Sequence, residues 1–287
     1  MRPFLKWAGG KTRIVDRIKE VLPDGRRLIE PFVGSGALFL NAEFPRYLLA
    51  DANKDLINCY QQLQSGGGEY IGRCAAYFTP ANNAADAYYA LRDRFNATVD
   101  PLERAALFVY LNRHGYNGLC RYNSSGGFNV PFGRYAKPYF PKDEMVAFCR
   151  KAPRCTFQVA GFLQTMDAAE PGDVVYCDPP YVPLSSTANF TSYNADGFTM
   201  ESQRALAAKA AEVARRGVPV IISNHDTPFT RTIYADAHDL IGFEVQRHIS
   251  CDGANRAKAA ELLAVFLGSP LPQHRSAAVT SPAEFSM

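Results

Sequence analysis

The sequence lacks the features that mark secreted, membrane-bound or metal-dependent proteins. Its seven cysteines are scattered and form no CxxC pair, which disfavours a disulfide framework or a zinc site and is typical of reduced thiols in a cytoplasmic protein. No HExxH pattern is present and the five histidines form no cluster, so no metal is expected. The longest apolar run covers residues 105–111, far short of the roughly 20 residues that span a bilayer, and neither a secretory signal nor a lipidation motif is recognisable.

The chain as a whole has little net charge. The 31 Lys and Arg residues against 28 Asp and Glu give a net charge of +3 over 287 residues, which is too small to name a partner. A composition of 47% hydrophobic and 21% charged residues is that of a folded protein and excludes wholesale disorder. The length allows one large domain or two modest ones.

Acidic residues are missing from one long segment, and this absence is informative. Residues 104–142 contain no Asp or Glu, but they contain six Lys or Arg residues and nine aromatic residues. Basic side chains interleaved with aromatic rings supply phosphate contacts together with stacking or intercalation, which favours binding of DNA or RNA. A solvated hairpin whose aromatic residues pack inward is the alternative.

Short, nearly continuous apolar runs predict strands that are buried on both faces of a parallel sheet. These runs cover residues 27–32, 47–51, 156–160, 173–177 and 218–223. Helical patterns cover residues 9–22, 36–44, 53–63, 85–96, 101–112 and 199–217. Thr199 is a plausible N-cap and Gly217 a helix stop. The alternation predicts an α/β fold, and two late runs, 243–250 and 261–267, predict an antiparallel pair at the sheet edge.

The strand–helix alternation is interrupted in the middle of the chain. We therefore predict a discontinuous catalytic domain, residues 1–53 and 142–268, with a second domain inserted at residues 54–141. Residues 269–287 are polar and contain proline, which predicts a disordered tail.

The tetrapeptide Asp178-Pro179-Pro180-Tyr181 follows the predicted strand at 173–177 directly, and ligands bind at the carboxyl ends of strands in such sheets. The prolines fix the backbone and donate no N–H, so nearby carbonyls are expected to be free to accept hydrogen bonds from a substrate. Together with the Asp178 carboxylate they would localise the lone pair of an exocyclic amine on a nucleobase, while Tyr181 stacks on the ring. A rigid strand-to-loop corner is the alternative.

Gly34 and Gly36 lie between a predicted strand and a predicted helix, where glycine lets the backbone approach a ligand closely. Asp51 ends the next strand, 17 residues after Gly34, where an acidic residue commonly accepts hydrogen bonds from ribose hydroxyls. An ordinary βα turn also explains the glycines, and the third glycine of the dinucleotide fingerprint is missing. The combination favours a nucleoside cofactor without a pyrophosphate, such as S-adenosylmethionine.

Trp7, the only tryptophan, and Lys11 flank a Gly-Gly turn near the N-terminus. One interpretation is a turn whose tryptophan fills the core. The other is a strap over the cofactor, with Lys11 near its carboxylate and Trp7 near its methionine end.

Six motifs occur in the order FLKWAGGK, EPFVGSG, LLADAN, YLNRHGYNGLCRYN, FNVPFGRY and VVYCDPPY. Together they closely resemble the Dam family of DNA adenine methyltransferases, the GATC-specific enzymes of bacteria, over about residues 4–267. DPPY also occurs in other amino-methyltransferases, whereas the run from 111 to 135 is more specific to Dam. The resemblance implies a Rossmann-like methyltransferase fold, with a mixed seven-stranded sheet and an inserted helical and β-hairpin target-recognition domain.

The resemblance also implies a function. The protein would transfer a methyl group from S-adenosylmethionine to the N6 amine of adenine in double-stranded GATC, after flipping the base out of the duplex. It would act in the cytoplasm as a monomer, without a metal, a membrane or an obligatory protein partner.

The resemblance further assigns roles to individual residues. The target adenine would be held by Asp178, Pro179, Pro180 and Tyr181. The cofactor would contact Trp7, Lys11, Phe32, Gly34, Gly36, Asp51, Phe162, whose ring stacks on its adenine, and Asp178. DNA would contact Lys6, Arg113, Tyr116, Asn117, Leu119, Arg121, Asn123, Asn129, Arg134 and Tyr135.

Within the DNA set the implied roles differ. Tyr116 and Asn117 would wedge into the duplex, and Arg121 and Leu119 would read flanking base pairs. An arginine fork suits a guanine edge and an apolar side chain suits a thymine methyl. The phosphate contacts would come from Arg113, Asn123, Asn129 and Arg134.

Three alternatives stay open at this point. The first is an amino-methyltransferase that acts on cytosine, RNA or a protein amide, and the second is a DNA-binding protein without activity. The third is a nicotinamide oxidoreductase, which only the glycine turn suggests. One departure from the Dam pattern is the loop at 250–258, where Cys251 and Asp252 replace an expected Gly/Asn-rich turn; if that loop tracks phosphate, Asp252 would weaken the contact slightly.

Overall fold

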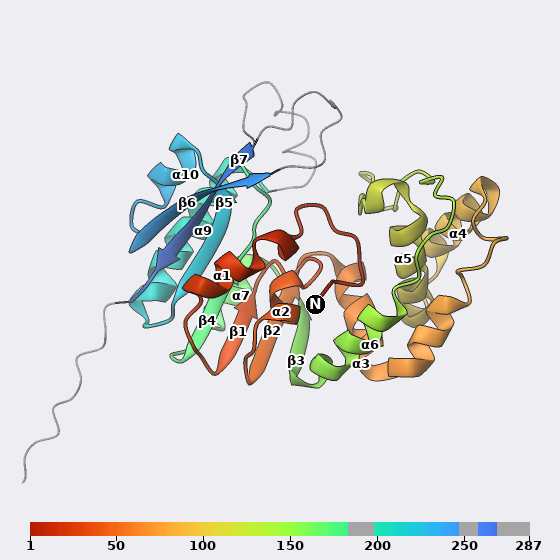
Figure 1. Ribbon diagram of the computed structural model, residues 1–287, viewed down its shortest axis with the longest axis horizontal. Coiled ribbons are helices and arrows are strands. Elements are labelled where there is room, and N and C mark those ends of the chain that lie inside the picture. The colour runs from red at the N-terminus through yellow and green to blue at the C-terminus, as the bar shows by residue number, and fades with distance from the viewer. Residues whose placement is uncertain (183–197, 247–257, 269–287) are drawn as a thin grey trace, which may run out of the picture.

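The computed structural model describes residues 1–182, 198–246 and 258–268. The predictions for the tail at 269–287 and for the loop at 250–257 lie outside these residues. A seven-stranded sheet with the strand order β3-β2-β1-β4-β5-β7-β6 forms the centre of one half of the molecule (Figure 1). The first five strands are parallel, whereas β7 is antiparallel to both β5 and β6. The predicted α/β fold with a mixed seven-stranded sheet is therefore confirmed.

The strands begin and end within three residues of the predicted runs, except β6, which begins four residues before the run predicted at 243–250. They are β1 (Arg27–Glu30), β2 (Arg46–Asp51), β3 (Cys155–Val159), β4 (Asp173–Cys177), β5 (Val220–His225), β6 (Asp239–Gln246) and β7 (Lys258–Phe266). All five residues of β4 are buried, as expected for a central strand covered on both faces. The late antiparallel pair is confirmed. Strand β7 inserts between β5 and β6, so β6 is the edge strand at that side of the sheet.

The described residues also form α-helices and short 3-10 turns. They are α1 (Val15–Val21), α2 (Ala37–Asn41), α3 (Lys54–Ala75), α4 (Ala85–Ala97), α5 (Pro101–His114), α6 (Lys142–Lys151), α7 (Phe162–Asp167), α9 (Met200–Arg215) and α10 (Pro228–Ile233), with short 3-10 turns η1 (Lys11–Arg13), η2 (Tyr116–Gly118) and η3 (Ala152–Arg154). In this part of the chain, no helix is long and apolar enough to cross a bilayer.

Helix ends follow the local sequence signals in most places. The Thr199 hydroxyl accepts a hydrogen bond from the Ser202 amide at the start of α9, and Gly217 adopts a φ of +83° just beyond its end. The predicted helix at 9–22 is wrong at its start. Gly9 has a φ of +74° and Gly10 a ψ of 131°, so the chain enters η1 first and α1 begins only at Val15.

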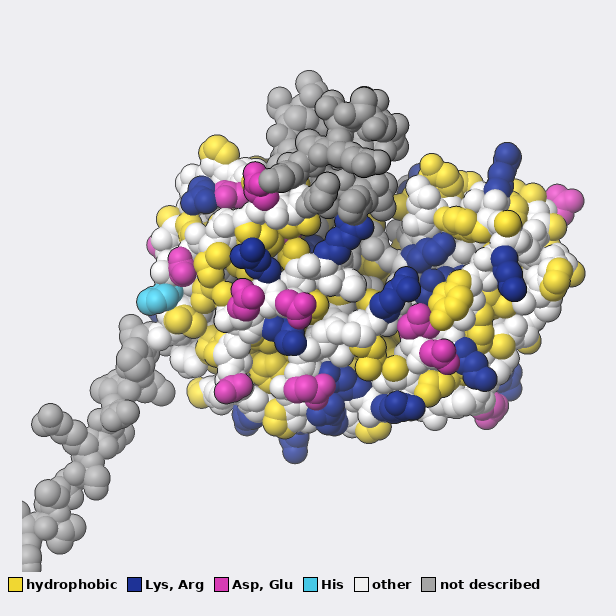
Figure 2. Space-filling model, in the orientation of Figure 1, with side chains coloured by type: hydrophobic (Ala, Val, Ile, Leu, Met, Phe, Trp, Pro, Cys, Tyr) yellow, Lys and Arg dark blue, Asp and Glu magenta, His cyan; other side chains and the backbone are white. Residues whose placement is uncertain are grey.

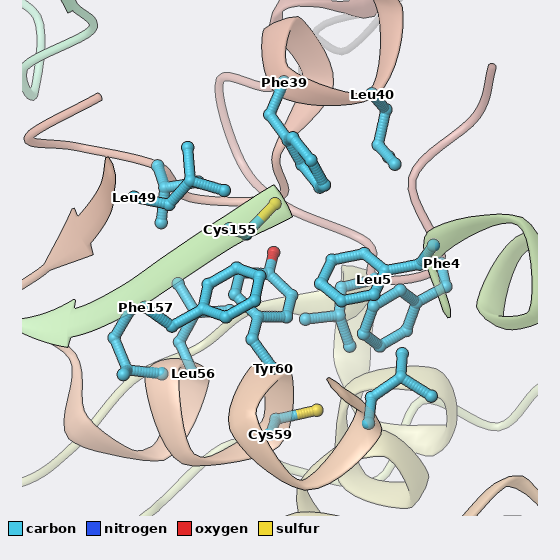
Figure 3. Close-up of a cluster of buried hydrophobic side chains, with 14 of the residues drawn as sticks. Phe4, Leu5, Phe39, Leu40, Leu49, Leu56, Cys59, Tyr60, Cys155 and Phe157 are labelled. Carbon is cyan, nitrogen blue, oxygen red and sulfur yellow. The ribbon is translucent and has the colours of Figure 1, made fainter. Parts of the chain in front are cut away.

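Helix α3 is longer than predicted and connects the two halves of the molecule. Its side chains Leu56 and Tyr60 point toward Phe157 of β3 (Figure 3), and the Tyr60 and Phe157 ring centroids are 5.4 Å apart. On its other side α3 contacts α5. One hydrophobic cluster therefore runs without a break from the sheet into the helices α3, α4 and α5, at the right of Figure 1. The domain boundary at residue 54 stays a prediction.

The opposite face of the sheet is covered by α7 and α9. The residues that recur at helical spacing in α9, namely Leu206, Ala210 and Val213, are all fully buried against this face. The sheet is thus a middle layer between helices. Polar groups can reach it mainly where the strands begin and where they end.

A buried carboxylate closes the amino-terminal edge of the sheet. Asp173, at the start of β4, has no exposed surface and accepts hydrogen bonds from Arg26 Nε at 3.1 Å, Arg27 Nη2 at 2.5 Å and the Glu170 amide at 2.9 Å. Since Arg27 begins β1, these bonds fix the ends of two neighbouring strands against each other.

We predict that Asp173→Asn lowers the free energy of unfolding by about 2 kcal/mol, because charge-assisted hydrogen bonds to a buried acceptor are lost. Urea denaturation at pH 7 measures the change. The matched control is Asp167→Asn, which removes a surface ion pair with Lys209 and should cost less than about 1 kcal/mol. Equal losses in the two variants would contradict the role given to Asp173.

Candidate active site

Polar side chains gather at the carboxyl ends of four parallel strands. Glu30 ends β1, Asp51 ends β2, Asp178 follows β4 directly, and Ser223 lies near the end of β5. Because β2, β1, β4 and β5 are consecutive neighbours in the sheet, these groups share one edge. This is the edge at which α/β sheets bind their ligands.

The centre of this edge is an ion pair. Lys11 Nζ lies 2.8 Å from Asp178 Oδ1, donates to the Gly9 carbonyl at 2.7 Å and sits 4.1 Å from the centroid of the Tyr181 ring. Ser223 Oγ donates to the same Asp178 oxygen at 3.1 Å. Burial raises the pKa of Asp178 above its usual range, and Lys11 and Ser223 oppose that rise. The corner therefore holds a nitrogen between a carboxylate and an aromatic face.

The two prolines of this corner differ in their surroundings. The Pro180 carbonyl accepts a hydrogen bond from Gln203 Nε2 at 2.7 Å, so the expectation of a free carbonyl is wrong at this position. Among the described residues none donates a hydrogen bond to the Pro179 carbonyl. Tyr181 donates its hydroxyl to Glu261 Oε2 at 3.3 Å, which anchors the outer end of its ring.

Trp7, Gly34 and Asp51 meet beside this corner. Gly34 and Gly36 have φ values of +46° and +73°, which other residues rarely adopt, and a Cβ on Gly34 would lie 2.9 Å from Trp7 Nε1. Asp51 accepts hydrogen bonds from the amides of Gly34 at 3.1 Å and Asn53 at 2.9 Å. Burial raises the pKa of Asp51, and these backbone bonds oppose the rise.

Three aromatic rings form a second group at the same edge. Phe32 and Phe162 stack with their centroids 5.5 Å apart at an interplanar angle of 23°, and Phe198 packs edge-on against both. The structure thus brings the two predicted cofactor-binding phenylalanines together. Phe198 was not predicted, because it precedes a helix and no local motif marks it.

Glu30 also belongs to this site, although no role was predicted for it from the sequence. It is 3% exposed, accepts a hydrogen bond from the Phe39 amide, and its Oε1 has no partner in the described part of the chain. Burial, together with the nearby charge of Asp178, raises the pKa of Glu30 to about 8. An acidic residue inside an apolar run that predicts a buried strand is the signal that marks such a group.

Ser223, His225 and Glu261 were also missed. His225 packs against the Tyr181 ring with centroids 4.7 Å apart, and its register partner in the sheet is Glu261. Ser223 and His225 could have been found from the sequence, because they are polar residues at the end of the apolar run of β5. The placement of Glu261 could not, because it depends on the insertion of β7 between β5 and β6.

After α5, residues 115–132 of the acid-free segment form a hairpin in the half of the molecule that contains α4 and α5. Isolated bridges pair Gly115 with Phe132 and Tyr122 with Phe128. At its base, in η2 beside the Gly115–Phe132 bridge, Tyr116 is 50% exposed, and Asn117, with a φ of 53°, donates its amide to the Tyr135 hydroxyl at 2.9 Å.

Several predicted DNA contacts lie on this hairpin and on the N-terminal segment beside it. Lys6 Nζ sits 4.0 Å from the centroid of the Tyr135 ring, and Arg121 Nε donates to Asn129 Oδ1 at 2.8 Å. Asn123 organises the hairpin loop by accepting hydrogen bonds from the amides of residues 125 and 127. Leu119 is half-buried against the core and Arg134 is another residue with a φ of 53°.

Arg113 is placed differently from the other predicted DNA contacts. It is 7% exposed, donates to the Phe4 carbonyl, and desolvation lowers its pKa to about 10. A phosphate contact from Arg113 stays a prediction and requires its guanidinium to leave this carbonyl. In the view of Figure 2, Lys and Arg side chains lie on both sides of the notch between the half with the sheet and the half with α4 and α5.

Comparison with known proteins decides the family. Residues 7–249 match the D12 class N6 adenine-specific DNA methyltransferases. The chain belongs to this family. It is 51% identical over 265 residues to the DNA adenine methylase of Escherichia coli (strain K12), which covers 92% of the chain and 95% of that relative. It is 52% identical over 266 residues to the DNA adenine methylase of Vibrio cholerae serotype O1 (strain ATCC 39315 / El Tor Inaba N16961), with 92% and 96% covered.

Similarity to solved structures is much weaker. The delta-N METTL16 MTase domain is 9% identical, with a TM-score of 0.41 and coverage of 89% of this chain and 81% of that one, and it carries no weight for function. Family membership is sufficient: this D12-class enzyme is a DNA (adenine-N6)-methyltransferase. The nicotinamide oxidoreductase, the inactive DNA-binding protein and the methyltransferase of cytosine, RNA or protein are therefore excluded.

We predict that Glu30 makes the stability of this D12-class enzyme depend on pH. In the unfolded chain Glu30 has its ordinary pKa of 4.5, whereas in the folded protein burial raises its pKa to about 8. Between these values the folded state binds one more proton, so the free energy of unfolding falls as the pH rises, by up to about 1.4 kcal/mol per pH unit. Urea denaturation from pH 5 to pH 8 measures this slope.

Glu30→Gln should flatten the slope, because glutamine does not ionise. Glu43→Gln is the matched control. Glu43 is exposed and pairs with Lys151 and Arg154, which lower its pKa, so its stabilisation is lost only on acidification. A slope above pH 5 that survives in Glu30→Gln would contradict the assignment.

Proposed function

We propose that the enzyme transfers a methyl group from S-adenosylmethionine to the N6 amine of an adenine that has been flipped out of duplex GATC. One observation carries the proposal: the nitrogen of Lys11 lies between the Asp178 carboxylate and the face of the Tyr181 ring. An exocyclic amine on a stacked base needs the same two neighbours. The GATC target is supported by the Dam-like motifs of the hairpin.

The residues at the sheet edge fit the proposed cofactor. A side chain on Gly34 would collide with Trp7. Glycine at this position lets a ligand lie directly against the backbone. Asp51 offers a carboxylate at the place where ribose hydroxyls bind, and Lys11 offers a cation for a carboxylate. Phe162 would stack on the adenine of the cofactor. When bound, S-adenosylmethionine supplies an electrophilic methyl group on a sulfonium sulfur.

The chain then activates the amine by orienting it. The lone pair of adenine N6 is delocalised into the ring, so the amine is a weak nucleophile. The Asp178 carboxylate and the Pro179 carbonyl accept its two N–H groups and localise the lone pair toward the methyl group, while Tyr181 holds the base plane. The Asp178 carboxylate is also the nearest acceptor for the proton that the amine gives up.

Lys11 has two partners in this scheme. In the structure it neutralises Asp178, and the base amine needs the position that its Nζ holds. A carboxylate on the cofactor would draw the Lys11 ammonium away from Asp178 and open the corner. The scheme therefore favours binding of the cofactor before the flipped base enters.

DNA recognition is assigned to the hairpin. Tyr116 would take the stacking position that the adenine vacates, which offsets part of the few kcal/mol that base flipping costs. Arg121 would grip a guanine edge, and Leu119 would contact a thymine methyl group. Arg134 would contact phosphate, which adds affinity without sequence information.

The function is tested with methyl-labelled S-adenosylmethionine and two duplexes that differ only in one GATC site. We expect label in N6-methyladenine of the GATC duplex alone, as read by mass analysis of the nucleosides. Asp178→Ala should lower turnover by about 10²–10³-fold, because a positioned acceptor is lost, and should largely spare DNA binding. Asp167→Ala, at a surface ion pair, is the control with unchanged turnover. Equal labelling of both duplexes would contradict GATC specificity.

We further predict that Arg121→Ala and Arg134→Ala weaken the enzyme in different ways. Losing Arg121 should reduce discrimination at one G·C pair by about 1–3 kcal/mol, or roughly 5- to 150-fold in kcat/KM. Losing Arg134 should weaken binding of all duplexes evenly and reduce the salt dependence of Kd. Fluorescence anisotropy over a salt series and competition between duplexes separate the two outcomes; identical behaviour would contradict the assignment.

A further inference from the structure

Asn112, near the end of α5, holds the N-terminal strap, which we define as residues 4–11. Lys6 donates its amide to Asn112 Oδ1 at 2.8 Å, and Asn112 Nδ2 donates to the Lys6 carbonyl at 2.7 Å. One side chain that is 2% exposed thus pairs with both main-chain groups of Lys6. The next residue of α5, Arg113, donates to the carbonyl of Phe4 at the start of the strap.

The same amide reaches the DNA-reading hairpin. Asn112 Nδ2 lies 3.4 Å from the Gly118 carbonyl, and a Cβ on Gly118 would overlap the Cβ of Lys6. Tyr135 contacts both parts as well, because its hydroxyl accepts the Asn117 amide and its ring lies under Lys6 Nζ. The η2 turn at the base of the hairpin therefore rests directly on the strap, and it cannot shift without moving Lys6 or breaking these contacts.

The other end of the strap lies in the active site. Trp7, next to Lys6, packs on Gly34, and Lys11 pairs with Asp178. A shift of Lys6 is transmitted along one residue to Trp7 and along five to Lys11. The strap therefore connects the η2 turn to the corner in which the amine would be held.

We infer that Asn112 is a positioning residue that couples sequence recognition by the hairpin to the geometry of the active site through the strap. This inference rests on the proposed function, because it needs the hairpin to distinguish GATC from other duplexes. Asn112 touches neither DNA nor cofactor in this scheme. Its role is to make the position of Lys6, and hence of Trp7 and Lys11, depend on what the hairpin binds.

Trp7 is the only tryptophan, so its fluorescence reports on the strap without labelling. In the wild type, a GATC duplex should change this fluorescence and lower the KM for S-adenosylmethionine, whereas a scrambled duplex should do so much less. In Asn112→Ala both duplexes should still bind. The two duplexes should then produce the same fluorescence and the same KM, and the ratio of their kcat values should fall roughly 10-fold.

Asn96→Ala is the matched control. Asn96 clamps Phe128 with the same pair of bonds, accepting its amide at 2.8 Å and donating to its carbonyl at 3.1 Å, within the hairpin half but away from the strap. It should alter the melting temperature while leaving the duplex-dependent fluorescence intact. If Asn112→Ala does not fold, Asn112→Asp keeps the acceptor for the Lys6 amide but loses both donated bonds, and it should lose the coupling in the same way.

The outcomes separate the two proposals. A wild type that treats GATC and scrambled duplexes alike contradicts the proposed target and the coupling together. A wild type that distinguishes them, beside an Asn112 variant that distinguishes them equally well, overturns the role of Asn112 alone. Loss of the duplex-dependent signal in Asn112→Ala but not in Asn96→Ala supports it.

Discussion

A largely buried ion pair joins the first turn of the chain to the central strand of the sheet. Lys11 comes from the N-terminal strap and Asp178 follows β4, and both lie where the carboxyl ends of four parallel strands converge. Burial of Asp178 would be unfavourable without its partners, so the strap, Ser223 and the Tyr181 ring are held around it. The remaining parts of the site take their positions relative to this pair.

Much of the architecture follows from local sequence patterns. The apolar run at 173–177 matches β4 residue for residue, since a strand buried on both faces needs no polar side chain. Thr199 and Gly217 mark the ends of α9, because a cap and a left-handed glycine act over a few residues. Asp178 and Asp51 were identified for a related reason, as acidic residues that end apolar runs.

Other features depend on contacts between distant parts of the chain, and local patterns do not reveal them. The position of β7 between β5 and β6 brings Glu261 to the Tyr181 hydroxyl, and no spacing in the sequence indicates it. The interior location of Arg113 is a similar case. A basic residue in an acid-free segment suggests a phosphate contact, whereas its partner is a main-chain carbonyl 109 residues away. Burial of Glu30 likewise required the packed structure.

The hydrophobic cluster that α3 shares between the sheet and the half with α4 and α5 limits which exchanges of sequence the fold can accept. Residues from the sheet, α3, α5 and the hairpin belong to one packed interior. Exchange of residues 54–141 as a block between two relatives would cut through this interior and leave mismatched surfaces on both sides. Substitutions at exposed hairpin residues such as Tyr116 and Arg121 leave the interior untouched. If the hairpin reads DNA as proposed, new sequence preferences are therefore expected to arise by point changes at such exposed residues rather than by exchange of the whole block.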